Sequence, residues 1–66
     1  MLIIFNGNPV EIQSGLDIES LVTTRGLEAS RVVVELNCEI INSLNWKKTV
    51  LKENDRIEVI SFVGGG

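Results

Sequence analysis

The sequence predicts a single α+β domain in which one short helix covers a mixed β-sheet. Two observations predict this class: β-prone runs bounded by turn residues lie near both ends of the chain, and a segment with helical periodicity lies between them. The chain of 66 residues has room for one modest core, because a domain of this size buries only about 60% of the surface that its unfolded chain exposes. We expect this domain to span residues 1–63 and a flexible glycine tail to span residues 64–66.

The first two strands are expected to form a hairpin. Residues 2–6 are a short β-prone run, and the turn-forming residues 6–9 follow it. Residues 10–13 alternate apolar and polar side chains, as a half-exposed strand does. Ser14 and Gly15 then end the hairpin.

A helix is expected at about residues 17–25. Asp17 is a suitable N-cap, since its carboxylate can accept a hydrogen bond from a free backbone N–H at the helix start. One apolar stripe recurs at helical spacing and consists of Ile18, Leu21 and Val22. Gly26 is suited to end the helix, because glycine enters the left-handed conformation without a steric penalty.

The strongest strand signal is the valine-rich run at residues 31–37. Its core-facing side is expected to consist of Val32, Val34 and Leu36. A tight turn at residues 37–39 leads into a short strand at residues 40–41. A helical turn at residues 42–46 follows, and its tryptophan, Trp46, is expected to cover the edge of the core.

The last strand is expected at residues 56–63, after a brief extended segment at residues 49–51 and a turn at residues 53–55. Alternation places Ile57 and Val59 toward the core. A hairpin, one crossover helix and a C-terminal group of strands make the two terminal strands parallel neighbours, joined by a right-handed connection. This mixed sheet with one crossover helix is the β-grasp, or ubiquitin-like, arrangement.

Composition and charge exclude several classes of function. The net charge is −3 and the basic residues are scattered, so we expect no nucleic-acid partner. The chain has no histidine and a single cysteine, Cys38, which predicts no metal site and no internal disulfide and fits a reducing compartment, a cytoplasm or a plastid. Its apolar runs are too short to span a membrane. We find no acid–base or nucleophile constellation, so we expect neither an enzyme nor a bound cofactor.

The most informative feature is the glycine end of the chain, Gly64, Gly65 and Gly66, which directly follows the last predicted strand. Because glycine has no side chain, such a tail can enter a slot too narrow for any other residue. The only reactive group that it delivers there is the backbone carboxylate of Gly66. The sequence therefore predicts that this terminus is the working part.

Over essentially its whole length the chain resembles the small sulfur-carrier proteins of thiamin biosynthesis, the ThiS-like family. The resemblance rests on the segments at residues 4–7, 36–41 and 50–58, on Trp46, and on the Gly-Gly end. The chain departs from the family pattern at Asn37-Cys38, where Asn-Gly is common, and in ending on three glycines.

The resemblance implies a carrier and three kinds of partner. An E1-like adenylating enzyme (ThiF-like) would use Mg-ATP to convert the Gly66 carboxylate to an acyl-adenylate, with the three tail glycines in its active site. A sulfur donor fed by a cysteine desulfurase would then replace AMP and leave a C-terminal thiocarboxylate. Thiazole synthase (ThiG-like) would take up that sulfur. Cys38 is interpreted as a turn residue.

A partner-docking patch is expected on the outward side of the last strand. It consists of the outward residues Glu58, Ile60 and Phe62, of Val63 beside the tail, and of Ile4 on the neighbouring first strand. Apolar side chains that cluster on an exposed face mark an interaction site.

Three other functions stay open at this point. The small subunit of molybdopterin synthase also ends in Gly-Gly on this fold, although such proteins are longer. A ubiquitin-like modifier would form an isopeptide bond with a target lysine. A non-covalent β-grasp interaction module would not need a free glycine end.

Overall fold

The computed structural model describes residues 1–62 as a five-stranded mixed sheet with one α-helix and two short 3₁₀ helices. The elements in chain order are β1 (Leu2–Phe5), β2 (Asn8–Glu11), α1 (Ile18–Thr24), η1 (Ala29–Arg31), β3 (Val32–Leu36), β4 (Glu39–Ile41), η2 (Ser43–Lys48) and β5 (Arg56–Ser61). The strand order is β2-β1-β5-β3-β4, and only β1 and β5 are parallel. This confirms the predicted β-grasp fold with parallel terminal strands.

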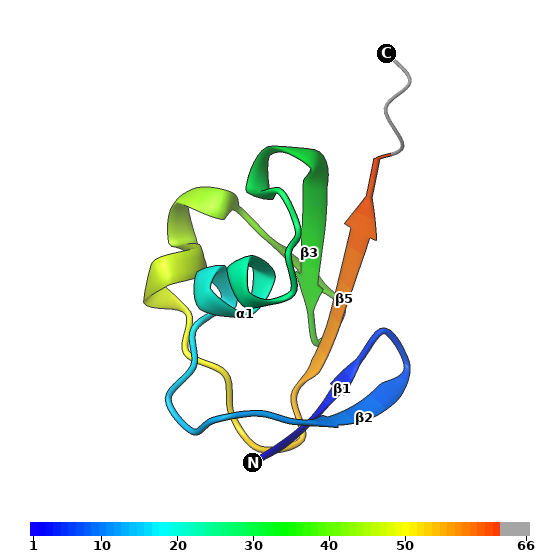
Figure 1. Cartoon of the computed structure of the whole chain (residues 1–66), viewed down its shortest axis with the longest axis vertical. Helices are drawn as coiled ribbons and strands as arrows, with labels where there is room; N and C mark the ends of the chain where they lie inside the picture. The colour runs from blue at the N-terminus through cyan, green and yellow to red at the C-terminus, as the bar shows by residue number, and fades with distance from the viewer. Residues whose placement is uncertain (63–66) are drawn as a thin grey trace.

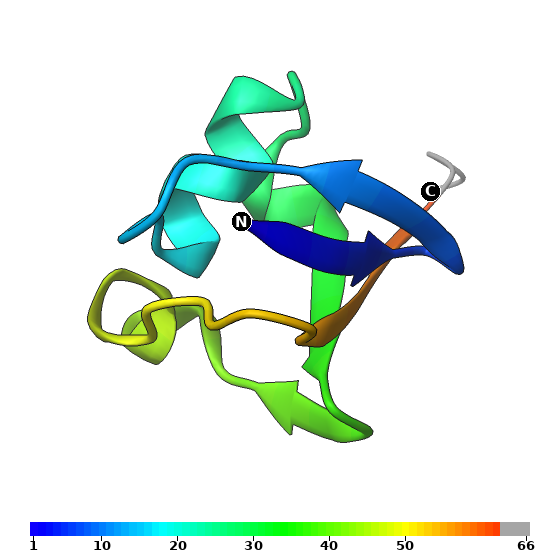
Figure 2. The same cartoon turned by 90° about the horizontal axis from the view of Figure 1, so that it is seen from below.

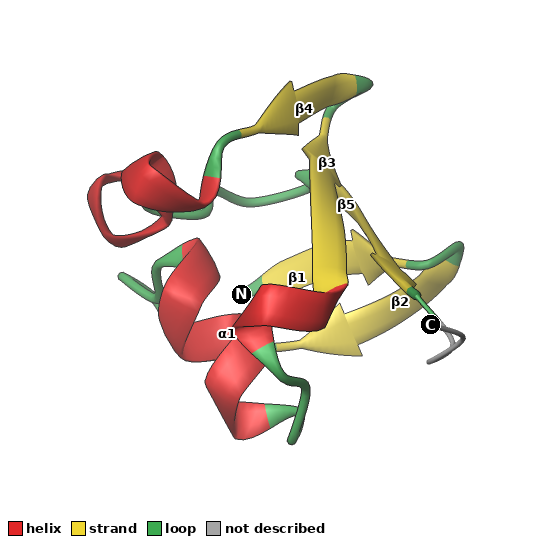
Figure 3. Ribbon diagram, turned by 90° about the horizontal axis from the view of Figure 1, so that it is seen from above, coloured by secondary structure: helices red, strands yellow, loops and turns green. Residues whose placement is uncertain are grey.

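Strand β5 lies in the middle of the sheet, between β1 and β3 (Figure 1). The helical segments all lie on one side of the sheet (Figure 3), and Figure 2 shows the same arrangement from below. The other face of the sheet has no helix over it among the described residues. One face therefore carries the core and the opposite face meets solvent.

The core consists of apolar side chains that α1, η2 and the inner face of the sheet contribute together. Its buried members are Ile3, Ile18, Leu21, Val22, Val32, Val34, Trp46, Leu51, Ile57 and Val59. The predicted inward residues of the helix and of the two long strands are all among them or packed against them. Burial of this apolar surface is the main stabilising contribution to the fold.

Both ends of α1 follow the local sequence. Asp17 caps the start, where its Oδ1 atom accepts a hydrogen bond of 2.7 Å from the backbone N–H of Ser20. Gly26 follows the C-cap residue with a φ of 73°, the left-handed conformation expected of it. The arginine between them, Arg25, places its guanidinium 4.8 Å from the centroid of the Phe5 ring.

Two hairpins turn through two-residue loops of the same kind. Phe5 pairs with Asn8 across Asn6-Gly7, and Leu36 pairs with Glu39 across Asn37-Cys38. All four loop residues have positive φ angles of 48°, 83°, 50° and 73° in chain order. This is the loop geometry whose twist matches that of the flanking strands, and it favours Asn-Gly.

Several predicted boundaries were wrong by one or two residues. The second strand begins at Asn8, not at residue 10, because Pro9 is tolerated in a strand at the edge of a sheet. Arg31 ends the 3₁₀ helix η1, which the sequence reading missed, so β3 begins one residue later than expected. Strand β5 ends at Ser61, and Val63 lies outside the described residues.

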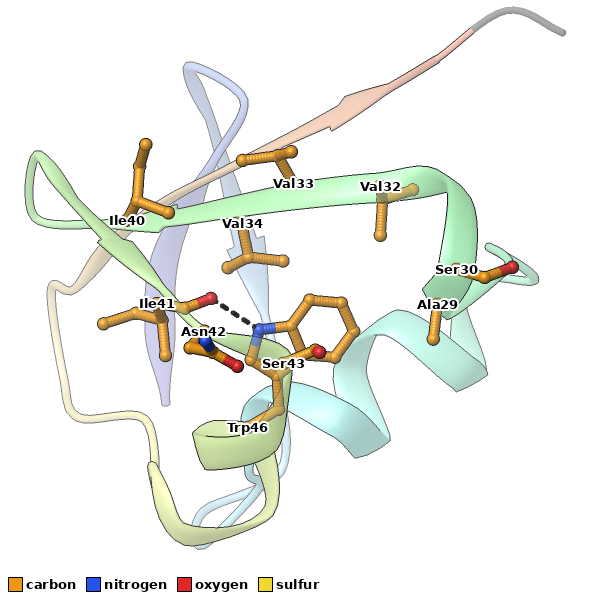
Figure 4. Close-up of a pocket in the computed structure, with 10 residues that line it drawn as sticks. All are labelled: Ala29, Ser30, Val32, Val33, Val34, Ile40, Ile41, Asn42, Ser43 and Trp46. Atoms are coloured by element: carbon orange, nitrogen blue, oxygen red, sulfur yellow. Dashed lines mark hydrogen bonds between the residues drawn. The ribbon is translucent and has the colours of Figure 1, made fainter. Parts of the chain in front are cut away.

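Trp46 covers the core edge as predicted. Its side chain is buried, and its Nε1–H donates a hydrogen bond of 2.9 Å to the carbonyl oxygen of Ile41 (Figure 4). An indole N–H that leaves water needs such a partner. The hydrogen bond therefore ties the helical turn η2 to the end of β4.

Candidate functional site

The candidate site is the C-terminal half of β5 and the sheet face beside it. Burial along β5 alternates from Arg56 to Ile60: Ile57 is 0% exposed and Val59 9%, whereas Ile60 is 52% exposed, and Phe62, just after the strand, is 60% exposed. The outward positions therefore present apolar side chains to solvent immediately before the glycine tail, as the sequence predicted for Ile60 and Phe62. Val63, Gly64, Gly65 and Gly66 lie outside the described residues.

The β3–β5 register enlarges this patch with residues that sequence reasoning missed. Val33 lies directly opposite Ile60, so the two outward side chains are cross-strand neighbours. Ile40 of β4 lies opposite Glu35 and is 66% exposed. The outward register of Val33 was visible in the sequence, but its position beside Ile60 depends on a long-range strand pairing.

The structure places Ile4 diagonally from Glu58 but apart from the apolar members of the patch, Ile60 and Phe62. Ile4 pairs with Arg56, four residues before Ile60 along β5, which is a separation of about 13 Å at about 3.3 Å per residue. Its side chain is half-buried, whereas Glu58, Ile60 and Phe62 are exposed. The apolar surface beside the tail therefore centres on β5 and β3, and we name it the exit face: Val33, Glu35, Ile40, Glu58, Ile60 and Phe62.

Two carboxylates lie next to each other on the exit face. Glu35 and Glu58 are directly opposite in the β3–β5 register. Like charges at directly opposed positions destabilise a sheet. Neither has a salt bridge to any residue of the described part of the chain. The exit face therefore combines exposed apolar side chains with two adjacent carboxylates.

The base of the tail is held by main-chain hydrogen bonds on the β3 side. Val32 pairs with Ser61, and the backbone N–H of Phe62 donates a hydrogen bond of 2.8 Å to the carbonyl oxygen of Arg31. The β3 edge thus follows β5 to its last residue. In Figure 1 this end of β5 extends beyond the β1–β2 hairpin and lies beside β3.

A groove of about 320 Å³ lies on the far side of β3, between η1, β4 and η2 (Figure 4). Its lining contains aliphatic side chains, two serines, an asparagine and Trp46, and none of these side chains is ionisable at neutral pH.

Across residues 1–62, no three His, Cys, Asp or Glu side chains gather as metal ligands. No helix within the same residues is long and apolar enough to cross a membrane.

In a comparison with protein families, the model of the ThiS family matches residues 3–66 of the chain. Among individual relatives, the sulfur carrier protein ThiS of Bacillus subtilis is 41% identical over 49 residues, which are 74% of each chain. The thiazole synthase of Magnetococcus marinus is 36% identical over all 66 residues. The chain spans only 20% of that protein's length, as it does for a second thiazole synthase, from Paramagnetospirillum magneticum.

A solved structure has the same fold over its full length. The crystal structure of a thiamine biosynthesis protein (ThiS) from Geobacter metallireducens superposes with a TM-score of 0.86, at 30% sequence identity, and covers 100% of both chains. The likeness therefore extends over the sheet, its helix and the strand that leads into the tail.

Proposed function

Because the chain belongs to the ThiS family, we propose that it is a sulfur carrier of thiamin biosynthesis and not an enzyme, with sulfur attached at Gly66. The observation that carries this proposal is the extent of the family match, which continues through residue 66. The glycine residues that follow β5 thus fall within the part of the chain that matches the family.

The chemistry starts from the Gly66 carboxylate. A C-terminal carboxylate is ionised at neutral pH, and its negative charge and poor leaving group make it resistant to nucleophiles. An E1-like adenylating partner (ThiF-like) removes both obstacles: a carboxylate oxygen bonds to the α-phosphorus of ATP and pyrophosphate leaves. A persulfide sulfur supplied through a cysteine desulfurase then bonds to the acyl carbon and AMP departs. A second thiol attacks the S–S bond of the resulting acyl disulfide, forms a disulfide with the donor sulfur and releases the C-terminal thiocarboxylate. Splitting one difficult step into two easier ones is the advantage of such activation.

Delivery of the Gly66 carboxylate to a partner's active site depends on the length of the tail and on the entropy lost when the tail is fixed there. Residues 63–66 extend at most about 14 Å at about 3.6 Å each, enough to carry the terminus from a docked domain into a buried site. Fixing the backbone there costs about 1–2 kcal/mol per residue. Contacts elsewhere must offset this cost, and glycines 64–66 bring no side-chain contacts of their own.

The exit face supplies those contacts. Ile60 and Phe62 are apolar, more than half exposed, and directly precede the tail. Val33 extends the apolar surface across the sheet, and the opposed carboxylates of Glu35 and Glu58 favour a basic group on the partner. An apolar centre with a charged rim is the usual composition of a specific interface. We propose this face as the docking site for the adenylating enzyme.

The receiving partner is proposed to be a thiazole synthase (ThiG-like). This is supported by the two proteins of that name that resemble the chain over 20% of their own length. Neither nucleic acid nor membrane is required as a partner, and the chain needs no cofactor of its own. The single cysteine, Cys38, is consistent with a reducing compartment such as a cytoplasm.

Intact mass spectrometry tests the proposal. Protein isolated from cells, or loaded with an adenylating enzyme, ATP and a desulfurase, should gain about 16 Da when sulfur replaces oxygen, and fragment ions must place the gain at Gly66 because oxidation of Met1 or Cys38 adds the same mass. Protein amidated at Gly66 is the matched control and should remain unloaded. A mass gain that survives amidation, or one that maps elsewhere, would refute sulfur loading at this residue.

A further inference from the structure

The two edges of β5 are held differently. On the β3 side, strand pairing continues to Ser61 and the Phe62 N–H extends it. On the β1 side, the ladder ends at the pair Phe5 and Ile57, because the chain turns away at Asn6-Gly7. The last main-chain group of the hairpin to reach β5 is the N–H of Asn6, which donates to the Ile57 carbonyl oxygen at 2.9 Å.

The main-chain groups of Val59 would be the next ones without a partner on this edge. Along a strand, alternate residues direct their N–H and C=O groups to the same edge. Since Ile57 faces β1, Val59 and Ser61 face it too. The β1–β2 turn leaves no backbone there to meet them.

The side chain of Asn6 takes the place of the missing strand residue. Its Oδ1 atom accepts a hydrogen bond of 2.8 Å from the Val59 N–H, and its Nδ2 atom donates one of 3.3 Å to the Val59 carbonyl oxygen. A carboxamide carries an acceptor oxygen and a separate donor nitrogen at its tip, so it can bond to the N–H and the C=O of one residue at the same time. A carboxylate only accepts hydrogen bonds, and a hydroxyl has its donor and its acceptors on a single oxygen. Its position depends on the left-handed backbone of Asn6, whose φ is 48°.

We propose that Asn6 is a positioning residue for sulfur loading, because it holds β5 on the β1 side two residues beyond the backbone ladder and thereby fixes the strand end that precedes the tail. This role rests on the proposed function. Without the carboxamide, residues 59–62 are held only by β3, and the strand end gains freedom that must be lost again when the tail is fixed in the adenylating site. The exit face itself keeps its shape, because Ile60 and Phe62 hydrogen-bond toward β3.

The expected signature is a loss in kcat with KM preserved. Asn6→Gly removes the carboxamide and keeps the turn, since glycine accepts a positive φ without strain. We expect kcat for adenylation, followed as pyrophosphate release with the E1-like enzyme, to fall about tenfold, which is the factor for fixing about one more residue of backbone. KM should stay within about twofold, because it reports docking through the exit face. Hydrogen exchange of the Val59 amide should accelerate.

Asn37→Gly is the matched control. Asn37 occupies the same position in the other hairpin, with a φ of 50°, and its side chain also accepts from a β5 amide, that of Arg56, at 3.0 Å. It lies at the opposite end of β5 from the tail. We expect this variant to lose comparable stability and to keep the wild-type kcat.

The outcomes separate this role from the function on which it rests. The positioning role would be overturned if Asn6→Gly had the wild-type kcat, or if Asn6→Gly and Asn37→Gly lost kcat equally. Either result would leave the carrier function intact. If wild-type protein is not adenylated at all, the carrier function fails and the role of Asn6 fails with it. Should Asn6→Gly not fold, Asn6→Asp retains the acceptor for the Val59 N–H but sets an oxygen against the Val59 carbonyl, and the same loss in kcat is expected.

Discussion

The β3–β4 hairpin turns through Asn37 and Cys38, and both have positive φ angles, 50° and 73°. Asparagine tolerates this conformation better than most residues, but cysteine gains nothing from it. The equivalent position of the β1–β2 hairpin is Gly7, with a φ of 83°. We therefore predict that Cys38→Gly stabilises the protein.

The magnitude follows from two opposing terms. A residue with a Cβ atom in the left-handed region costs about 1–2 kcal/mol, which glycine does not incur. Glycine instead loses more conformational freedom on folding, about 0.5–1 kcal/mol relative to alanine. The difference is a gain of about 0.5–1 kcal/mol in the free energy of unfolding. In a domain of 60–100 residues, about 1 kcal/mol raises Tm by about 4–8 °C.

Urea denaturation followed by tryptophan fluorescence measures this gain, since the sole tryptophan, Trp46, is buried. Cys38→Ala is the control: it removes the exposed thiol, keeps the Cβ atom, and should leave stability within about 0.5 kcal/mol of the wild type. Gly7→Ala is the reverse test. A Cβ atom there would meet no neighbour within 4 Å, so its expected loss of about 1 kcal/mol is purely conformational. If Cys38→Gly is no more stable than Cys38→Ala, backbone strain at this turn is refuted.

Three further predictions concern the exit face and the core edge. Ile60→Glu should raise KM for adenylation at least about tenfold with the circular dichroism spectrum unchanged, whereas Leu44→Glu on η2, at an even more exposed position, should not. Glu58→Gln should raise the free energy of unfolding by about 0.2–1 kcal/mol, because it removes the like-charge pair with Glu35. The same variant should bind the adenylating enzyme more weakly in calorimetry, and a gain in affinity would exclude a basic partner group. Trp46→Phe should destabilise the protein by about 1–3 kcal/mol, because it leaves the Ile41 carbonyl of β4 without its indole donor. Urea denaturation followed by circular dichroism measures this loss, and an unchanged midpoint would contradict the hydrogen bond.

Local sequence signals predicted most of the elements. Asp17 predicted a helix start because its carboxylate satisfies a nearby backbone N–H, an interaction that spans only three residues. Alternation along residues 56–60 predicted which side chains of β5 face outward, since successive strand residues point to opposite faces. The 3₁₀ helix η1 was missed because three residues carry too little periodicity to be recognised.

By itself, the sequence determined the fold class and the inward and outward sides of the long strands, and it predicts the glycine end as the working group. Each of these depends on periodicity or on the chemistry of one residue type. Only the tertiary structure decided which outward residues are neighbours: Val33 beside Ile60, and Glu35 beside Glu58. It also joined Asn6 to Val59, which are 53 residues apart in the chain. Strand register and such hydrogen bonds depend on how the whole sheet assembles around its buried face, and no local pattern encodes them.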